Sequence, residues 1–266
     1  MFQFDVIATI LLFTVFFIEF GLIVANKPGK DVITDMKSNF LIGLCLITVG
    51  LFVKGVELSL FSLLYSVSIF KPSYSVGLWI AAILCCDFIH YAYHWLGHKT
   101  RIFWAAHVTH HSSEHFNLST GWRTNFFHLF YRFLFWSPLC FFGFPPEMIL
   151  FIESVTAIQN FIVHTEKVGK LGILDLIFNT PSNHRVHHAT NPQYIDKNLG
   201  GIFMIYDHLF KTYAKEEATP VYGITHNIKT HDAREILLHE YKHLIKNVPK
   251  IRSNVRRFKY LFSPPT

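Results

Sequence analysis

Residues 75–98, SVGLWIAAILCCDFIHYAYHWLGH, contain the pattern that decides the fold of this chain. The first half of the segment is almost entirely apolar, and the second half introduces Asp87 and His90 before ending in His94 and His98. A helix needs about 20 apolar residues to cross the hydrocarbon core of a bilayer. The segment therefore predicts a membrane-spanning helix that leaves the bilayer among histidines.

The composition of the whole chain agrees with a membrane protein. Of the 266 residues, 51% are apolar, 17% are aromatic and only 16% are charged, and the mean hydropathy is +0.29. These values lie outside the range of ordinary soluble domains and exclude a disordered chain. The net charge of +6 belongs to basic residues that flank apolar runs, where lipid headgroups explain them. We expect a membrane partner and no nucleic-acid partner.

Four other apolar stretches predict further membrane-embedded helices. Residues 6–25 form a first span, and residues 40–70 form a span to about Val53 followed by an interfacial or re-entrant stretch that ends at Lys71 and Pro72. Residues 126–144 and 148–163 form a hairpin around Pro145 and Pro146. The expected fold is an all-α integral membrane protein with four or five membrane-embedded helices and a cytosolic helical cap, which carries a histidine-rich di-metal site.

The distribution of basic residues predicts the orientation in the membrane. Residues 26–38 carry three lysines, the stretch after the third span carries Lys99, Arg101 and Arg123, and the turn at residues 145–146 carries none. Basic loops face the cytosol. We therefore expect residues 26–39, residues 97–125 and everything after residue 164 to be cytosolic, with the active site on that face. The host membrane is the bacterial inner membrane or the endoplasmic reticulum.

Histidine is unusually frequent, with 17 residues against 18 acidic ones. Eight of them fall in three clusters with i, i+3 and i+4 spacings. These spacings place side chains on one face of a helix. Imidazole suits iron and zinc, and two metal ions with five or six positions each could use eight imidazoles and leave room for dioxygen. The eight candidate ligands, assigned as metal-binding and catalytic, are His94, His98, His107, His110, His111, His184, His187 and His188.

His164, at the cytosolic end of the predicted hairpin, is assigned as the ninth metal ligand, and His90 is a further candidate. The four cysteines lie inside apolar segments, so neither disulfides nor a cysteine metal site is indicated. The chain has no CxxCH haem motif, no GxGxxG nucleotide loop and no iron–sulfur spacing. Any electrons for redox chemistry must come from a separate donor.

The three clusters resemble the histidine boxes of the fatty acid hydroxylase/sterol desaturase superfamily of membrane di-iron oxygenases. Residues 87–98 are similar to its first box, 107–114 to its second and 179–188 to its third. Residues 117–120, 162–166 and 194–198 resemble the alkylglycerol monooxygenase-like branch in particular. The resemblance covers roughly residues 75–215. We accordingly expect N-terminal spans in 1–74, a catalytic domain in 75–215 and a basic cytosolic tail in 216–266.

The resemblance implies two iron ions, dioxygen and a lipid substrate such as an ether lipid, a fatty acyl chain or a sterol, which is hydroxylated or desaturated. It also implies a separate reductase, ferredoxin or cytochrome, or tetrahydrobiopterin, as the electron donor. The chain departs from the family pattern at Trp95 and Lys99, where Arg and Glu are usual, and at Asn183, where a further His is common. Lys99 reverses the usual charge, which favours a reductant other than tetrahydrobiopterin, unless Lys99 faces lipid headgroups.

Acidic residues near the clusters are candidates for orienting the imidazoles, because metal-bound histidines usually donate their second N–H to such a partner. We assign Asp87, Glu114 and Asp196 to this cofactor-binding role, with Glu166 as a further candidate. The alternative is that these acids pair with basic neighbours, which are Arg101, Lys167, Arg185 and Lys197.

Three other functions compete with an oxygenase. A histidine-lined metal transporter would place its ligands in the middle of the bilayer, whereas these clusters begin where the apolar runs end. A membrane metalloprotease would need an HExxH motif, which the chain does not contain. A catalytically inactive lipid-binding scaffold would not need three intact clusters.

Overall fold

The computed structural model describes residues 2–265, with side chains described from Ile10 onward. The described chain is helical, and its β pairing is confined to two isolated antiparallel bridges, Phe178 with Phe203 and Ala189 with Tyr222. The expected all-α class is confirmed. The elements, with 3-10 turns written η, are α1 (Phe2–Ala25), α2 (Lys30–Ser66), α3 (Val76–Lys99), α4 (Arg101–His111), η1 (Leu118–Trp122), η2 (Phe126–His128), α5 (Leu129–Phe141), α6 (Pro146–Ile162), α7 (Leu174–Ile177), α8 (Pro181–His187), η3 (Pro192–Tyr194), α9 (Ile205–Phe210), α10 (Ala233–Asn247), η4 (Val248–Lys250) and α11 (Asn254–Phe262).

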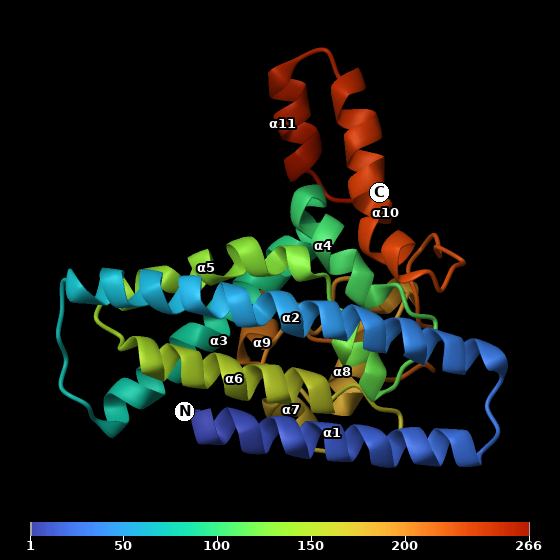
Figure 1. The fold of residues 1–266 in the computed structure, drawn as a ribbon, viewed down its shortest axis with the longest axis horizontal. Coiled ribbons are helices and arrows are strands. Elements are labelled where there is room, and N and C mark those ends of the chain that lie inside the picture. Colours follow the sequence, from blue (N-terminus) through green and yellow to red (C-terminus); the bar gives the residue numbers. More distant parts are fainter. Residues whose placement is uncertain (1, 266) are drawn as a thin grey trace.

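The long helices α1, α2 and α6 run side by side along the longest axis of the molecule (Figure 1). Helix α5 packs on α2, and α3 packs on both α5 and α6. The apolar core between these helices contains Phe61 from α2, Cys86 from α3, Trp136 from α5 and Met148 from α6, all at most 2% exposed. Burial of such large side chains between helices is the main stabilising term of the bundle.

Two helices in the described part of the chain, α2 and α3, are long and apolar enough to cross a membrane. The described residues of α1 from Ile10 to Ala25 form a shorter apolar stretch, and α5 and α6 have 13 and 17 residues. Leu51 and Phe52 on α2 are 77% and 75% exposed. Such exposure is costly in water and favourable in lipid. The structure thus supplies two candidate spans where the sequence predicts four or five membrane-embedded helices.

The expected break in the second apolar stretch is wrong. Helix α2 is continuous for 37 residues, from Lys30 to Ser66. At 1.5 Å per residue it is about 55 Å long, well beyond the roughly 30 Å hydrocarbon core. Residues 40–71 contain no proline that would end the helix. The polar N-terminal turns of α2 pack against other parts of the protein, so the helix extends beyond the length that a bilayer core could cover.

Local sequence explains where the next helices begin. The Ser75 side chain accepts a hydrogen bond from the backbone N–H of Leu78 at 3.1 Å and caps α3. Pro146 occupies the first position of α6, where its missing N–H costs nothing. The preceding turn needs Gly143, which has φ of +96° and would place a Cβ 2.3 Å from the carbonyl oxygen of Phe70.

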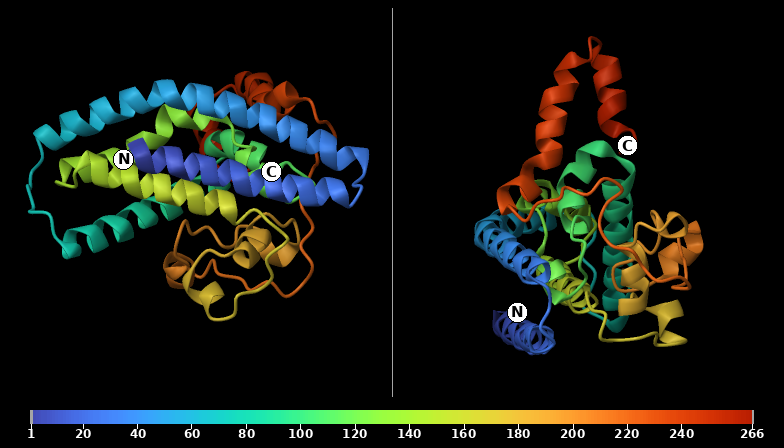
Figure 2. Two further views of the ribbon diagram at one scale, coloured as in Figure 1. Left: turned by 60° about the horizontal axis from the view of Figure 1, so that its bottom comes forward. Right: turned by 90° about the vertical axis from the view of Figure 1, so that its right-hand side faces the viewer.

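Two smaller units flank the bundle. The segment containing α7, α8 and α9 covers one flank, and the α10–α11 hairpin points away from the bundle (Figure 2). The C-terminal residues return to the body of the protein, because the Arg101 backbone N–H donates to the carbonyl oxygen of Ser263 at 2.9 Å. The histidine-bearing helix α4 lies between the α10–α11 hairpin and the bundle (Figure 1), and α8 belongs to the flank unit.

Candidate metal centre

Nine histidines from four separate segments converge in two adjoining groups. Within each group the ligand nitrogens all lie within 4.8 Å of one another. The five-histidine group contains His94, His98, His107, His111 and His187, and the four-histidine group contains His110, His164, His184 and His188. All eight clustered candidates and His164 are therefore brought together. His90 belongs to neither group, and its ring centre lies 5.6 Å from that of His94.

Each HxxHH motif is divided between the two groups, which corrects the expectation that a cluster presents all its imidazoles in one direction. His107 and His111 enter the five-histidine group, whereas His110 enters the four-histidine group. Positions i and i+4 differ by about 40° around a helix, while i+3 lies about 60° to the other side. The second motif is divided in the same way, and His111 stacks on His188 across the boundary with ring centres 4.4 Å apart.

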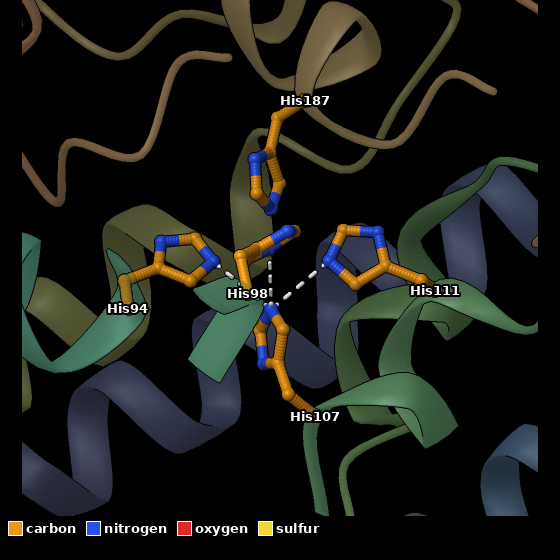
Figure 3. A group of neighbouring side chains, drawn as sticks. All are labelled: His94, His98, His107, His111 and His187. Carbon is orange, nitrogen blue, oxygen red and sulfur yellow. Dashed lines mark hydrogen bonds between the residues drawn. The ribbon is translucent and has the colours of Figure 1, made fainter. Parts of the chain in front are cut away.

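The imidazole nitrogens of the five-histidine group point toward a common centre (Figure 3). The Nε2 atom of His107 lies 3.0 Å from Nε2 of His94, 3.1 Å from that of His98 and 2.9 Å from that of His111. Two nitrogens bound to one ion at about 2.1 Å and at right angles lie about 3.0 Å apart. The observed spacing fits imidazoles that share one metal ion.

The four-histidine group has the same spacing. The Nε2 atom of His164 lies 2.9 Å from Nε2 of His184, 3.1 Å from that of His188 and 3.2 Å from that of His110. Burial is the main cause that lowers the pKa of these imidazoles, with neighbouring histidines adding to it, and the pKa of His110 falls to about 4. The rings are therefore neutral near pH 7, as metal coordination requires.

Backbone carbonyls orient three of the ligands. The Nδ1 atom of His94 lies 2.9 Å from the carbonyl oxygen of Leu199, and Nδ1 of His187 lies 3.0 Å from that of Lys197. The Nδ1 atom of His164 similarly meets the carbonyl oxygen of its own helix at position 160, at 2.5 Å. A carbonyl only accepts, so Nδ1 carries the proton and Nε2 keeps a free lone pair for a metal. Sequence reasoning missed these partners because any residue supplies a carbonyl.

Asp196 contacts His98, one of the histidines of the five-histidine group. Its Oδ1 atom lies 3.2 Å from Nδ1 of His98, and its other carboxylate oxygen pairs with Lys99 Nζ. Partial burial raises the pKa of Asp196, but hydrogen bonds from His98 and Lys99 outweigh it and lower the pKa to about 2. Lys99 is thus engaged by a carboxylate of the protein.

The other assigned acids contact different groups. The Asp87 carboxylate accepts hydrogen bonds from the backbone N–H of Ile202 at 2.7 Å and from that of the next residue at 3.3 Å. Glu166 accepts from the Tyr222 hydroxyl at 3.1 Å, and Glu114 is exposed. Within the described residues, Asp196 is the one of the assigned acids whose carboxylate touches a histidine of the two groups.

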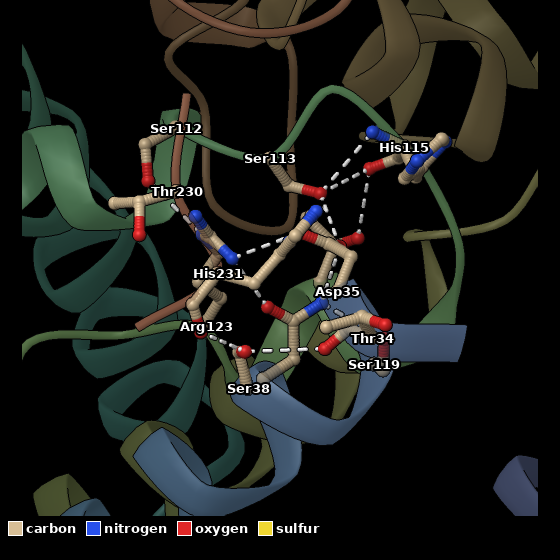
Figure 4. A network of polar contacts seen from close by, with 12 residues as sticks. Thr34, Asp35, Ser38, Ser112, Ser113, His115, Ser119, Arg123, Thr230 and His231 are labelled. Atoms are coloured by element: carbon tan, nitrogen blue, oxygen red, sulfur yellow. Dashed lines mark hydrogen bonds and ion pairs between the residues drawn. The ribbon is translucent and has the colours of Figure 1, made fainter. Parts of the chain in front are cut away.

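A buried polar network holds the end of α4, which carries three of the nine histidines (Figure 4). Arg123 Nη1 lies 3.0 Å from Oδ1 of Asp35 on α2, with both side chains 2% exposed, and it donates to Asn39 at 2.8 Å. Arg123 Nε donates to the Thr109 carbonyl at 3.1 Å, and His231 lies 3.6 Å from Asp35. Arg123, which the orientation argument counts as a loop charge, is in fact internal.

A cavity of about 500 Å³ leads from the two groups into the helix bundle. Its wall includes members of both groups, namely His94, His107, His110, His164 and His184, and it continues along apolar side chains such as Leu46, Leu129 and Phe161. Arg132 also borders it and forms a 2.8 Å ion pair with Glu153. The centre therefore opens onto a largely apolar space whose volume can take part of a lipid chain.

Comparison with known proteins agrees with this geometry. The fatty acid hydroxylase family model matches residues 79–212. Alkylglycerol monooxygenase from Homo sapiens is 37% identical over 218 residues, which is 80% of this chain and 48% of the human protein. The Danio rerio protein of the same name is 41% identical over 173 residues (65% of this chain, 39% of that protein).

A bacterial relative, ornithine lipid hydroxylase OlsE from Rhizobium tropici, is 30% identical over 135 residues, or 50% of this chain and 41% of that protein. No solved structure matches. The chain spans about half or less of the length of these curated relatives. The family model matches half of the residues of this chain, and both HxxHH motifs lie inside the matched range. This chain therefore belongs to the fatty acid hydroxylase family.

Proposed function

We propose that this chain is a di-iron, dioxygen-dependent monooxygenase that hydroxylates an unactivated C–H bond of a lipid. The observation that carries the proposal is the convergence of nine histidines, seven of them buried, in two adjoining groups at the end of a largely apolar cavity. Imidazole ligands suit iron, and two groups of five and four provide for two ions. All-nitrogen ligation also suits zinc, and family membership favours the redox metal.

Iron, when bound, would supply the chemistry that places one oxygen atom of dioxygen in a C–H bond while the other leaves as water, with two electrons and two protons from a donor. The protein fixes the tautomers of His94, His164 and His187 through backbone carbonyls, so that their Nε2 atoms keep a free lone pair for a metal. The cavity excludes bulk water and aligns the lipid chain beside the ligands.

The substrate in this proposal has a long apolar chain. The cavity wall is mainly apolar near Leu46, Leu129 and Phe161. The names of the relatives refer to an alkylglycerol and to an ornithine lipid, which both carry such chains. An ether lipid, a fatty acyl chain or a sterol fits this description, and desaturation of the same chain is the second outcome that the chemistry allows.

We further propose that the protein is a multi-pass membrane enzyme with its metal centre at the cytosolic face. Helices α2 and α3 supply two candidate spans, and His94 and His98 lie in the last two turns of α3. Seven of the nine histidines lie outside the two candidate spans. A metal transporter would require ligands within the spans, so this placement favours the enzyme.

The electron donor is a separate molecule in this proposal. A reductase, a ferredoxin or cytochrome, and tetrahydrobiopterin are the candidates, and Lys99 in place of the usual Glu favours a donor other than the pterin. Reduced pterin and a ferredoxin system, supplied separately to the solubilised protein, distinguish them by substrate-dependent oxygen uptake. Robust turnover with the pterin would reverse this preference.

The proposal as a whole is tested by lipid analysis of cells with and without the gene under ¹⁸O₂. We expect a lipid that gains one ¹⁸O atom only when the gene is present and that is absent in a His111→Ala strain. An unlabelled lipid that loses two hydrogen atoms would identify a desaturase. Lipid profiles that do not differ between the strains would contradict an oxygenase.

A further inference from the structure

A surface on the α7–α9 flank exposes an unusual number of apolar side chains. We call it the flank patch, and its members come from residues 171–178 and from α9. Ile173 is 72% exposed and Leu209 is 66% exposed. The other members are 37–52% exposed and are Leu171, Leu174, Leu176, Ile177, Phe178, Ile205 and Phe210. An apolar surface of this extent on one face marks a contact with a partner or a membrane.

Both acidic residues within these two segments point inward. Asp175 is 8% exposed and accepts hydrogen bonds from the Leu171 backbone N–H at 2.9 Å and the Thr180 hydroxyl at 2.5 Å. Asp207 is fully buried and accepts from the backbone N–H groups of residues 199 and 200. The exposed side of the patch is therefore free of charge, although two of its fourteen residues are acidic.

His208 is the exposed polar residue of the patch, and one of its two ring nitrogens is hydrogen-bonded within the protein. Its Nε2 atom lies 2.9 Å from the carbonyl oxygen of Leu176, so it donates to α7. Basic residues adjoin the patch in sequence, since Lys170 precedes its first segment and Lys211 follows its second, and both are exposed. Lysines at the rim of an apolar surface typically reach lipid headgroups.

Helix α9 lies beside the apolar part of a candidate span. The Tyr206 hydroxyl donates to the carbonyl oxygen of Leu84 on α3 at 2.7 Å, and the rings of Tyr206 and Phe88 are 5.3 Å apart between centres. Leu84 precedes His94 by ten residues, which is about 15 Å along the helix. Leu84 and Phe88 are themselves 40% and 42% exposed, so the patch continues the apolar face of α3.

From these observations we infer that the flank patch is embedded in the near leaflet of the bilayer and contacts acyl chains. The segment between His164 and His184 would then rest in the membrane, so residues 165–266 are not wholly cytosolic as the basic-residue rule predicts. A charge-free apolar face, rimmed by lysines and continuous with a span, has the composition of an interfacial membrane contact. The inference depends on α3 as a span and not on the reaction catalysed.

The test places the photo-crosslinking amino acid p-benzoylphenylalanine at one position at a time in the full-length protein, reconstituted in vesicles of phosphatidylcholine and phosphatidylglycerol with alkyne-tagged acyl chains. Positions 173 and 209 test the patch. Ile80, which is 54% exposed on α3, is the lipid-facing control, and the exposed Glu217 is the water-facing control. Bound metal verifies that each variant is folded.

We expect lipid adducts at positions 173 and 209 comparable with those at position 80 and several-fold above those at position 217. Adducts no higher than at position 217 would overturn the inference. Cross-links to a second copy of the chain or to another polypeptide, in place of lipid, would also overturn it and would identify the patch as a protein interface.

Discussion

The Oδ1 atom of Asp196 lies 3.2 Å from Nδ1 of His98, although the two residues are 98 positions apart in the chain. The carboxylate also pairs with Lys99, the residue that follows His98. Asp196 adopts a left-handed backbone conformation with φ of +58°, which Asp tolerates better than most residues. The loop after the third motif thus contacts a histidine of the first motif, and the unusual Lys99 takes part in that contact.

Replacing Asp196 by Ala should weaken metal binding at the five-histidine group by about 10- to 100-fold, because His98 loses the partner that orients its ring. Lys99→Met should have a smaller effect, since the bond between Asp196 and His98 remains. The metal affinity of both variants is measured from the amount of metal that each retains as the chelator concentration increases. Equal retention by Asp196→Ala and wild type would show that the contact does not support the site.

The protein should bind two metal ions per chain, and each group should lose its ion separately. We expect His111→Ala to deplete the five-histidine group and His184→Ala the four-histidine group, each with loss of about one ion and of activity. The exposed His226 supplies the control, because His226→Ala should keep both ions. Elemental analysis of the purified variants gives the number of metal ions per chain. An unchanged number in both His111→Ala and His184→Ala would contradict the assignment.

The metal-free protein should lose stability as the pH falls below about 6.5, the usual pKa of histidine. Burial lowers the pKa of His111 and His184 in the folded state, and it lowers the pKa of His110 to about 4, so the unfolded chain binds more protons in this range. Each such histidine then costs up to about 1.4 kcal/mol per pH unit. Thermal unfolding of the apoprotein at pH 8, 7, 6 and 5 measures this. A pH-independent unfolding temperature would show that the imidazoles are solvated.

Filling the cavity should block the substrate without removing metal. Gly50 borders the cavity, and a Cβ there would meet only Leu129 Cδ1, at 3.8 Å. Gly50→Ala should therefore be tolerated, whereas the larger side chain of Gly50→Leu should reduce turnover of long-chain lipids more than tenfold by occupying space that the chain needs. Turnover and metal content of both variants are compared. Full activity of Gly50→Leu would show that the lipid chain does not occupy the part of the cavity beside Gly50.

The ion pair between Arg123 and Asp35 should be essential to stability. Arg123→Met leaves the Asp35 carboxylate buried without its main partner, which costs about 3–5 kcal/mol. Lys242→Ala, which removes an exposed pair with Glu235, should cost less than about 1 kcal/mol. Denaturant unfolding in detergent measures the difference. Similar stabilities of the two variants would mean that water screens the internal pair.

Much of the site could be predicted because its signals are local. The spacing of His94 and His98, and of the residues in each HxxHH motif, is set by the turn of a helix, which the chain forms wherever apolar sequence and caps favour it. His164 lies alone in sequence, so no spacing pointed to it; its position at the end of the predicted hairpin made it a candidate, and it stands just after the last turn of α6.

Long-range packing decided what the sequence left open. The continuous course of α2 could not be predicted, because Phe40 to Phe70 is longer than a bilayer is thick and only the contacts of its N-terminal turns show that it continues into the protein. The inward direction of Asp175 and Asp207, which leaves the flank patch uncharged, likewise depends on backbone N–H groups that a folded loop supplies.

The sequence by itself determined the helical class, the apolar segments and the identity of the nine histidines, since composition and helical spacing are properties of short stretches of chain. The tertiary structure decided that His107 and His110 lie in different groups, that Asp196 and not Asp87 contacts a histidine of these groups, and that Arg123 is buried. The reason is that hydrogen bonds and desolvation act between groups that only packing brings together, and no local pattern records which partner each side chain will meet.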